Sequence, residues 1–445
     1  MPLQPLRFLH LCSGHNRGGK VICMSESVYW TWLSTRLGAA SPYLAPLVTK
    51  FVSAKAIYEA DRDALLSVER LPERIRLRLL NKELSRSERI LEDCKRLGIG
   101  VLTYSDSRYP SVLKYIATPP ALLYFKGQPV DFDKRLCIGV VGTRTMSEYG
   151  RDMAYRLGYD LASAGAVIVS GMALGIDGMS AAGALDAQAE TVAVLGCGLD
   201  RVYPAVHAKL CKSILNDGFL LSEYPPGTEP DGRNFPQRNR LISGLSRCTL
   251  VVEAPAQSGA LITARNAIRQ GRPVFAVPGN VGLSNSAGTN ELIKNGARLV
   301  TCAADILTSF DPAAFPDVDV CAIGSKRYDS ERAMRRYGVS AGNSGIKFIH
   351  LRKPAAEPDE FAEEAAGLPQ YDAEKTAQNS EFIMLPECEK AVYDRLPEEG
   401  GVSVDMLVSA TGQTVADVSM HLISLSVKGL AVSLPGNRYC RSCIK

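Results

Sequence analysis

Glycine residues follow the apolar runs of the central sequence at points where a phosphate group could approach the backbone. IGVV leads into Gly142-Thr143-Arg144, AVIVS into Gly171 and then Gly175-Ile176-Asp177, and TVAVL into Gly196 and Gly198. Helices that begin after parallel strands present unpaired N–H groups and a positive dipole end at one shared edge, so we expect these residues to bind phosphate there. Taken singly, each glycine can instead serve a tight turn and nothing more.

A second group of cations lies at residues 233–240, where RNFPQRNR precedes an apolar helix. Guanidinium forks match phosphate oxygens, and the ring of Phe235 can stack on any base. The arginines of this group are Arg233, Arg238 and Arg240. Pairing with Glu253 or Asp177 inside the fold is an alternative for one of them but not for all three. The group therefore predicts polyanion binding.

Other chemistry finds little support in the same sequence. The stretch Gly196-Cys197-Gly198 lacks the third glycine and the later acidic residue of a dinucleotide fingerprint, and no Gly-Lys-Ser loop is present. His207 is alone among the five histidines in lying in the central region. Cys440 and Cys443 have no second Cys or His pair nearby, as a zinc site requires. We expect no catalytic residue, no metal and no cofactor.

Short apolar runs alternate with helical segments from about residue 136 to 310, and this alternation predicts a parallel sheet. The runs are nearly continuous in apolar residues, which is typical of strands covered by helices on both faces. Right-handed crossovers then leave the carboxyl ends of the strands at one edge. The expected fold class is α/β, with an extended Rossmann-like, doubly wound, mostly parallel sheet.

The flanking sequence predicts two smaller domains. Leu and Ile recur at helical spacing before residue 100, and residues 382–441 read as three helices and a hairpin, a winged-helix pattern. Between them, a basic cluster at 326–353 gives way to an acidic stretch with too little apolar surface to fold. The expected segments are a disordered extension at 1–23, a helical domain at 24–115, a Rossmann-like domain at 116–310, a disordered linker at 311–381 and a winged-helix domain at 382–445.

Composition is that of an ordinary folded protein. Of 445 residues, 46% are hydrophobic and 22% are charged, which excludes collagen-like, mucin-like and wholly disordered classes. The apolar runs are too short to span a membrane, and the twelve cysteines are scattered like reduced core thiols. With no secretory signal at the start, we expect a cytoplasmic protein whose natural first residue is Met24. A net charge of +4 does not by itself establish a polyanion partner.

The motifs of the central region follow one another in a fixed series. They are VVGTR, SGMALGID, AVLGCGLDRVYP, LLSEYPPGT, FPQRNRLISGLS, VVEA, SGALITA, GRPVFAVPG and GTNELIKNGA. In order, spacing and wording this series resembles the DprA/Smf DNA-processing family. The helical segment before it and the winged helix after it fit the usual flanks of that family, the first being SAM- or HhH-like.

The resemblance implies a protein that binds single-stranded DNA without sequence preference, forms a homodimer through its Rossmann-like domain and loads RecA onto the strand during natural transformation. It implies neither enzymatic activity nor a membrane partner. Carried over by motif, the family pocket falls on Gly142, Arg144, Ser170, Gly171, Gly175, Asp177, Arg238, Asn239, Arg240, Ser243, Ser258 and Gly259. With Thr143, Gly196, Gly198 and Phe235 from the argument above, these residues are the predicted DNA-binding site.

This chain departs from the family pattern at three positions. Leu174 stands where relatives commonly have Arg or Lys, Ser180 replaces a frequent His, and Ala205 stands where some relatives carry Lys. The predicted pocket has therefore lost positive charge. We expect Arg144, Arg238 and Arg240 to dominate the phosphate contacts, with the 326–353 cluster as a source of further cations.

Two other functions remain open at this level. A nucleotide-binding or phosphoribohydrolase-like Rossmann enzyme would use the same edge, with Asp177 and Glu253 to activate water. A transcription regulator would use the winged helix, but its third helix at 414–429, the would-be recognition helix, offers only His421 and Lys428 against Asp417. We expect that winged helix to contact protein rather than read duplex DNA.

Overall fold

The computed structural model describes the greater part of the chain, which falls into two units divided at residue 348. The described residues are 26–323, 328–342, 387–397, 401–414, 417–418, 421–422, 424–425, 430–434 and 438–441. The expected extension, the start at Met24, the residues Lys326, Arg327 and Lys428, and the 343–381 part of the expected linker lie outside them.

A nine-stranded sheet in the order β1-β2-β6-β5-β4-β3-β7-β8-β9 forms the centre of the first unit. All neighbours from β6 to β9 run parallel, and β1 and β2 add antiparallel pairs at one side. The expected α/β fold is confirmed. The strands are β1 Gly100–Thr103, β2 Leu122–Gly127, β3 Cys137–Val141, β4 Val167–Ser170, β5 Thr191–Leu195, β6 Phe219–Ser222, β7 Cys248–Val251, β8 Val274–Ala276 and β9 Arg298–Leu299.

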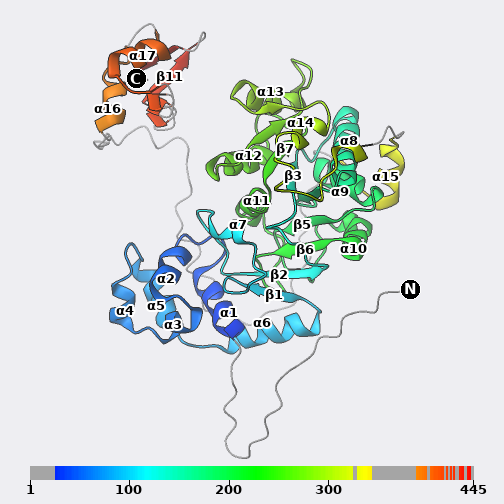
Figure 1. Ribbon diagram of the computed structural model, residues 1–445. Coiled ribbons are helices and arrows are strands. Elements are labelled where there is room, and N and C mark those ends of the chain that lie inside the picture. The colour runs from blue at the N-terminus through cyan, green and yellow to red at the C-terminus, as the bar shows by residue number, and fades with distance from the viewer. Residues whose placement is uncertain are drawn as a thin grey trace, which may run out of the picture. The chain divides into compact units, whose positions relative to one another are not determined.

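Every residue of β3, β4, β5, β6 and β7 is buried, because helices cover both faces of the sheet. Helices α8, α9 and α10 pack on one face, and α7, α11 and α12 pack on the other (Figure 1). Their bounds are α7 Ser111–Lys114, α8 Glu148–Ser163, α9 Ile176–Asp186, α10 Ala208–Asp217, α11 Asn234–Leu245, α12 Gly259–Arg269, α13 Ala287–Lys294 and α14 Ala304–Leu307. Short 3₁₀ turns are Ala205–His207, Ser284–Ser286 and Val320–Ala322.

Six short helices before the sheet share a core with β1 and β2, centred on the fully buried Trp30 and Trp32. They are α1 Glu26–Leu37, α2 Leu44–Phe51, α3 Ala54–Glu59, α4 Arg62–Leu66, α5 Glu73–Leu80 and α6 Ser85–Arg96. The expectation that residues 24–115 are helical is wrong at 100–103. That segment pairs with β2, because its alternating apolar residues complete the edge of the sheet.

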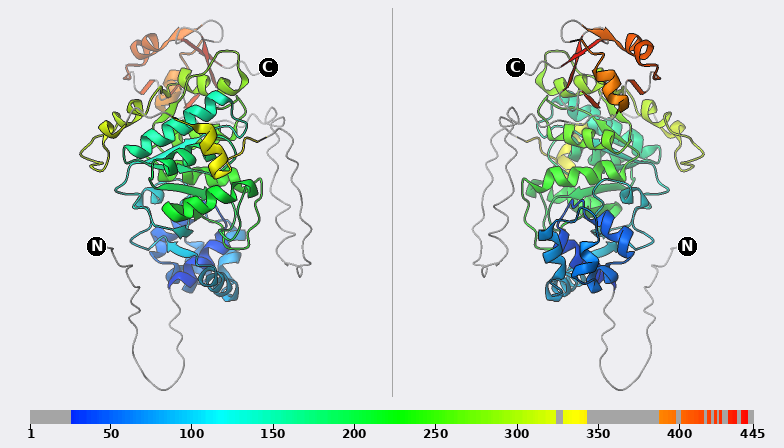
Figure 2. Two further views of the ribbon diagram at one scale, coloured as in Figure 1. Left: turned by 90° about the vertical axis from the view of Figure 1, so that its right-hand side faces the viewer. Right: turned by 90° about the vertical axis from the view of Figure 1, so that its left-hand side faces the viewer.

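Residues 328–342 fold back onto the sheet unit, so the expectation of a disordered linker is wrong for them and for 311–323. Helix α15, Ser330–Tyr337, is capped by the side chain of Asp329 and ends at Gly338 in the left-handed conformation. It packs against α8 and α9 (Figure 2) with Ala333 and Tyr337 buried, and Val339 is buried just after it. Three well-placed apolar side chains and two caps order a segment whose composition is dominated by charge.

The second unit contains a three-stranded antiparallel sheet in the order β10-β12-β11 and two helices among its described residues. These elements are α16 Glu387–Tyr393, β10 Val402–Ser403, α17 Val404–Thr411, β11 Ala431–Leu434 and β12 Arg438–Arg441. The predicted hairpin is confirmed as β11 and β12, and buried apolar residues such as Leu407 and Leu422 form a core between helices and sheet. Among the described residues of both units, no helix is long and apolar enough to cross a bilayer.

Candidate nucleic-acid interface

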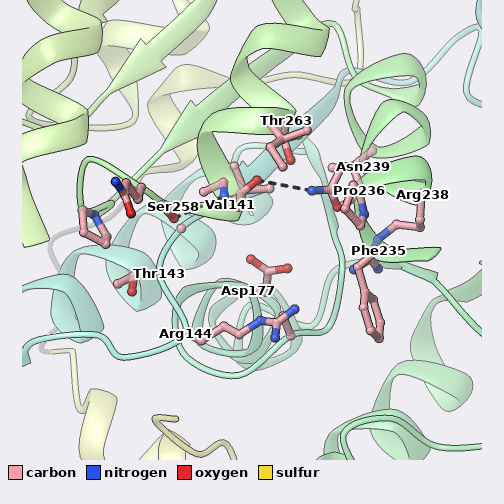
Figure 3. A pocket seen from close by; sticks show the side chains of 18 of the residues that line it. Val141, Thr143, Arg144, Asp177, Phe235, Pro236, Arg238, Asn239, Ser258 and Thr263 are labelled. Carbon is pink, nitrogen blue, oxygen red and sulfur yellow. Dashed lines mark hydrogen bonds between the residues drawn. The ribbon is translucent and has the colours of Figure 1, made fainter. Parts of the chain in front are cut away.

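A cavity of about 430 Å³ lies where the chain changes direction in the sheet, beyond the carboxyl ends of β3, β4 and β7. Ligands of doubly wound sheets bind at this switch point, because diverging loops leave a crevice there. Its walls come from the loop after β3, the start of α9, the first half of α11 and the start of α12 (Figure 3). Segments far apart in sequence thus meet at one site.

Nine of the predicted site residues line this cavity: Gly142, Thr143, Arg144, Asp177, Phe235, Arg238, Asn239, Ser258 and Gly259. Ser170, Gly171, Gly175 and Gly196 are buried around it. Sequence reasoning did not select Thr145, Gln257 and Thr263, although Thr263 lies in the SGALITA motif. These residues could have been found only from their positions after a strand or near a helix start, because their residue types do not indicate a binding site.

Arg144 is the exposed cation of the cavity. Within the described part of the chain its guanidinium forms no ion pair, and it lies 5.5 Å from the centre of the Phe235 ring. Tyr203 stacks on the same ring with centroids 5.2 Å apart. Phe235 therefore supports Arg144 through a cation–π contact while one of its faces is occupied by Tyr203. The Arg238 guanidinium also lies 5.8 Å from the ring centre, so Phe235 is engaged with protein groups rather than free to stack on a base.

Arg238 and Asp177 are two buried titratable groups in the lining of the cavity. Arg238 is 4% exposed, and its guanidinium donates to the carbonyl oxygens of Gly171, at 2.9 Å, and Val194. Burial lowers the pKa of Arg238 to about 10, while the nearby carboxylate favours its charged form. Burial also disfavours the charged form of Asp177 and raises its pKa. The Arg238 charge and the Gly171 N–H, which donates to Oδ2 of Asp177 at 2.9 Å, lower that pKa but do not cancel the effect of burial. Arg238 is thus largely committed to the protein.

The prediction that Arg240 binds phosphate is wrong. Its side chain is buried in an ion pair with Glu223, in which the single nitrogen Nη2 lies 2.6 and 2.8 Å from the two carboxylate oxygens. Oε1 of Glu223 also accepts from the Ala40 N–H at 3.2 Å, so the pair joins the helical region to the sheet. Ser243 is buried with its hydroxyl on the Arg240 carbonyl, and Arg233 pairs with Asp231 at 2.8 Å.

The glycines differ in what surrounds them. A Cβ at Gly171 would lie 2.6 Å from the Arg238 guanidinium, one at Gly196 2.9 Å from Phe235, and one at Gly142 2.5 Å from Ile176. Gly198 and Gly175 likewise face protein atoms, and Gly175 has a φ of +75°. These five glycines therefore allow close packing or a turn, and not the approach of a phosphate group. Gly259 has open space around its Cβ position and is the predicted glycine that a ligand can approach.

Two helix starts at this edge differ in the same way. The start of α8 is occupied, because Glu253 accepts from the Ser147 N–H at 2.9 Å and from its hydroxyl at 2.6 Å. The start of α12 faces the cavity, where the Ser258 hydroxyl accepts from the Ala260 N–H at 3.3 Å and Gly259 is exposed. Asn239 donates to the Gly259 carbonyl at 3.3 Å (Figure 3). Arg144 and the start of α12 can therefore hold an anion between them.

Comparison with known proteins gives a consistent result. Residues 100–311 match the family model described as DNA recombination-mediator protein A, and residues 376–437 match the DprA winged helix domain. The chain is 32% identical to Protein Smf of Synechocystis sp. over 424 residues, 94% of this chain and 99% of that protein. It is 42% identical to DNA processing protein DprA of Bacillus subtilis over 218 residues, 49% and 73% of the two chains. The X-ray structure of DNA processing protein A from Streptococcus pneumoniae is similar with a TM-score of 0.56 and 33% identity, covering 64% of this chain and 98% of that one.

Proposed function

The chain belongs to the DprA/Smf family of DNA-processing proteins, and from that premise we propose that it binds single-stranded DNA without sequence preference. The proposal includes transfer of the strand to a RecA-type recombinase during transformation, by a homodimer formed through the sheet unit in the cytoplasm. A family model that describes a recombination mediator supports this reading.

One observation carries the proposal: an exposed guanidinium, that of Arg144, lies at the switch-point cavity across from the open start of α12. Phosphate is the group that both features bind, since one supplies forked N–H donors and the other backbone N–H groups at a positive dipole end. The cavity wall adds Thr143, Asn239 and Ser258, which suit phosphate and sugar oxygens. Contacts of this kind do not depend on the base.

The enzyme alternative has less support, because both candidate carboxylates are engaged. Glu253 caps α8 through Ser147, and Asp177 accepts from Gly171 beside Arg238. A general base must reach the water that it activates. The proposed role is therefore binding without bond cleavage.

Arg144→Ala tests the site. We expect the variant to bind fluorescent single-stranded oligonucleotides of different sequence about tenfold more weakly or worse, and alike for all of them, because a charge-assisted phosphate contact is lost. In fluorescence anisotropy titrations at several salt concentrations, the slope of log affinity against log salt is expected to shrink by about 0.7, the contribution of one phosphate on a single strand.

Arg89→Ala is the matched control, since Arg89 is also exposed but lies on α6, away from the cavity. It removes the same charge and is expected to leave affinity nearly unchanged. Equal effects of the two variants, or stronger binding to duplex than to single strands, would contradict the proposal. Release of free base from nucleoside monophosphates would favour the enzyme alternative.

A further inference from the structure

The segment 328–342, which we call the strap, lies between the two regions that match family models. Side chains along it are held by carboxylates on α8 and α9. The donor and acceptor pairs are Tyr328 to Asp160 at 2.5 Å, Ser330 to Asp152 at 2.5 Å, and Tyr337 to Asp186 at 2.8 Å. These contacts fix the course of the strap along the outside of the sheet unit toward the cavity.

The far end of the strap reaches the loops that form the cavity. The Gly342 N–H donates to the Arg144 carbonyl at 2.7 Å, and the Gly175 N–H donates to the Ser340 carbonyl at 2.9 Å. A Cβ placed on Gly342 would lie 3.3 Å from both the Arg144 carbonyl oxygen and Leu174, so the strap is in close contact with this loop. The backbone that carries Arg144 is therefore held from two sides, by α9 and by the strap.

His207 links the strap to the loop after β4. The Ser340 N–H donates to Nε2 of His207 at 3.2 Å, so Nδ1 carries the ring proton and donates to the Met172 carbonyl at 3.1 Å. The imidazole is fully buried, and burial lowers its pKa, which favours the neutral form that these two bonds require.

We propose that the strap is a positioning element for nucleic-acid binding, which holds the Arg144 loop through Gly342 and Ser340 in the geometry that meets a phosphate. This inference rests on the proposed function, and it assigns a role to residues outside both matched regions. The strap itself is not expected to contact the strand. Its effect on binding passes through Arg144.

A double-mutant cycle in the full chain separates this role from general support of the fold. Gly342→Pro removes the N–H that reaches the Arg144 carbonyl, and we expect about fivefold weaker binding to a labelled oligo-dT strand, with a smaller salt slope. Combined with Arg144→Ala, the same change is expected to cause no further loss. Gly342→Ala keeps the N–H and should bind more tightly than Gly342→Pro. Arg335→Ala, on an exposed strap residue paired with Glu331 of α15, should bind like the unaltered chain.

A second pair of variants covers the case in which proline disturbs folding. His207→Leu removes the acceptor for Ser340 and should weaken binding, whereas His207→Gln offers an amide oxygen and should restore part of it. The inference is overturned if Gly342→Pro and His207→Leu bind normally while Arg144→Ala does not, or if their losses are equal with and without Arg144. If Arg144→Ala itself has no effect, the proposed site and the role of the strap are both wrong.

Discussion

Two arginines of α11, two positions apart, have different roles because helix positions i and i+2 point in different directions. Arg238 lies under the cavity beside Asp177, and Arg240 pairs with Glu223 from the end of β6. The sequence shows that one internal pair is plausible but not which arginine forms it. The partner, Glu223, follows another strand of the sheet, so only the three-dimensional fold shows which arginine lies beside it.

Arg240→Ala is expected to lower the stability of the fold and to leave the affinity for single-stranded DNA unchanged. It leaves the Glu223 carboxylate buried and unpaired, which costs about 3–5 kcal/mol of unfolding free energy. Urea denaturation measures the loss, and anisotropy at a temperature where the variant is folded should show unchanged affinity. Arg240→Met with Glu223→Gln removes both charges and should recover much of the stability. A stable Arg240→Ala variant with weakened DNA binding would contradict this assignment.

At the scale of elements, we expect the backbone N–H groups at the start of α12 to contact the DNA strand. Gly259→Ala should keep or raise stability by up to about 1 kcal/mol, because alanine suits a helix and nothing lies within 4 Å of its Cβ. Strand affinity should fall, since the added methyl group occupies the approach to the helix start.

Gly171→Ala is the matched comparison on the other side of the cavity. Its Cβ would displace the buried Arg238 guanidinium, so we expect stability to fall by about 1–3 kcal/mol. Thermal unfolding and anisotropy of both variants give the two readouts. The assignment of the α12 start fails if Gly259→Ala binds as tightly as the unaltered chain.

Helix α15 shows what compositional reasoning misses. The high charge of the segment indicated disorder, yet Asp329 at the N-cap and Gly338 after the last turn are ordinary helix boundary signals. The apolar residues that anchor it are few, and their value depends on the face of α8 and α9 that they meet. That complementary face is not visible in the local sequence.

At the scale of the whole molecule, the sheet and the edge at which the cavity lies could be predicted. Continuous apolar runs and right-handed crossovers specify a parallel sheet, and the shared carboxyl edge then brings Arg144, Asp177 and Ser258 to one cavity. Which glycines face open space could not be predicted. That distinction depends on side chains that enter from other elements, such as Phe235 against Gly196.

Mild acid is expected to loosen the attachment of the strap. The pKa of His207 is lowered in the folded chain, so the unfolded chain takes up its proton first, and the histidine contribution to stability falls as the pH drops below about 6.5. Asp177, whose pKa is raised by burial, acts in the opposite direction at lower pH. The difference in unfolding free energy between the unaltered chain and His207→Gln, measured by urea denaturation from pH 7.5 to 5.5, isolates the histidine. A difference that does not change with pH would refute this expectation.

Because the cavity is lined by segments far apart in the sequence, its parts are synthesised at different times. A nascent chain emerging from the ribosome presents Arg144 early, but the opposing wall exists only after Thr263 has been translated, and Gly342 follows later still. An incomplete polypeptide thus carries the guanidinium without the surroundings that orient it. The proposed binding of a DNA strand therefore requires that synthesis has passed the entire central region.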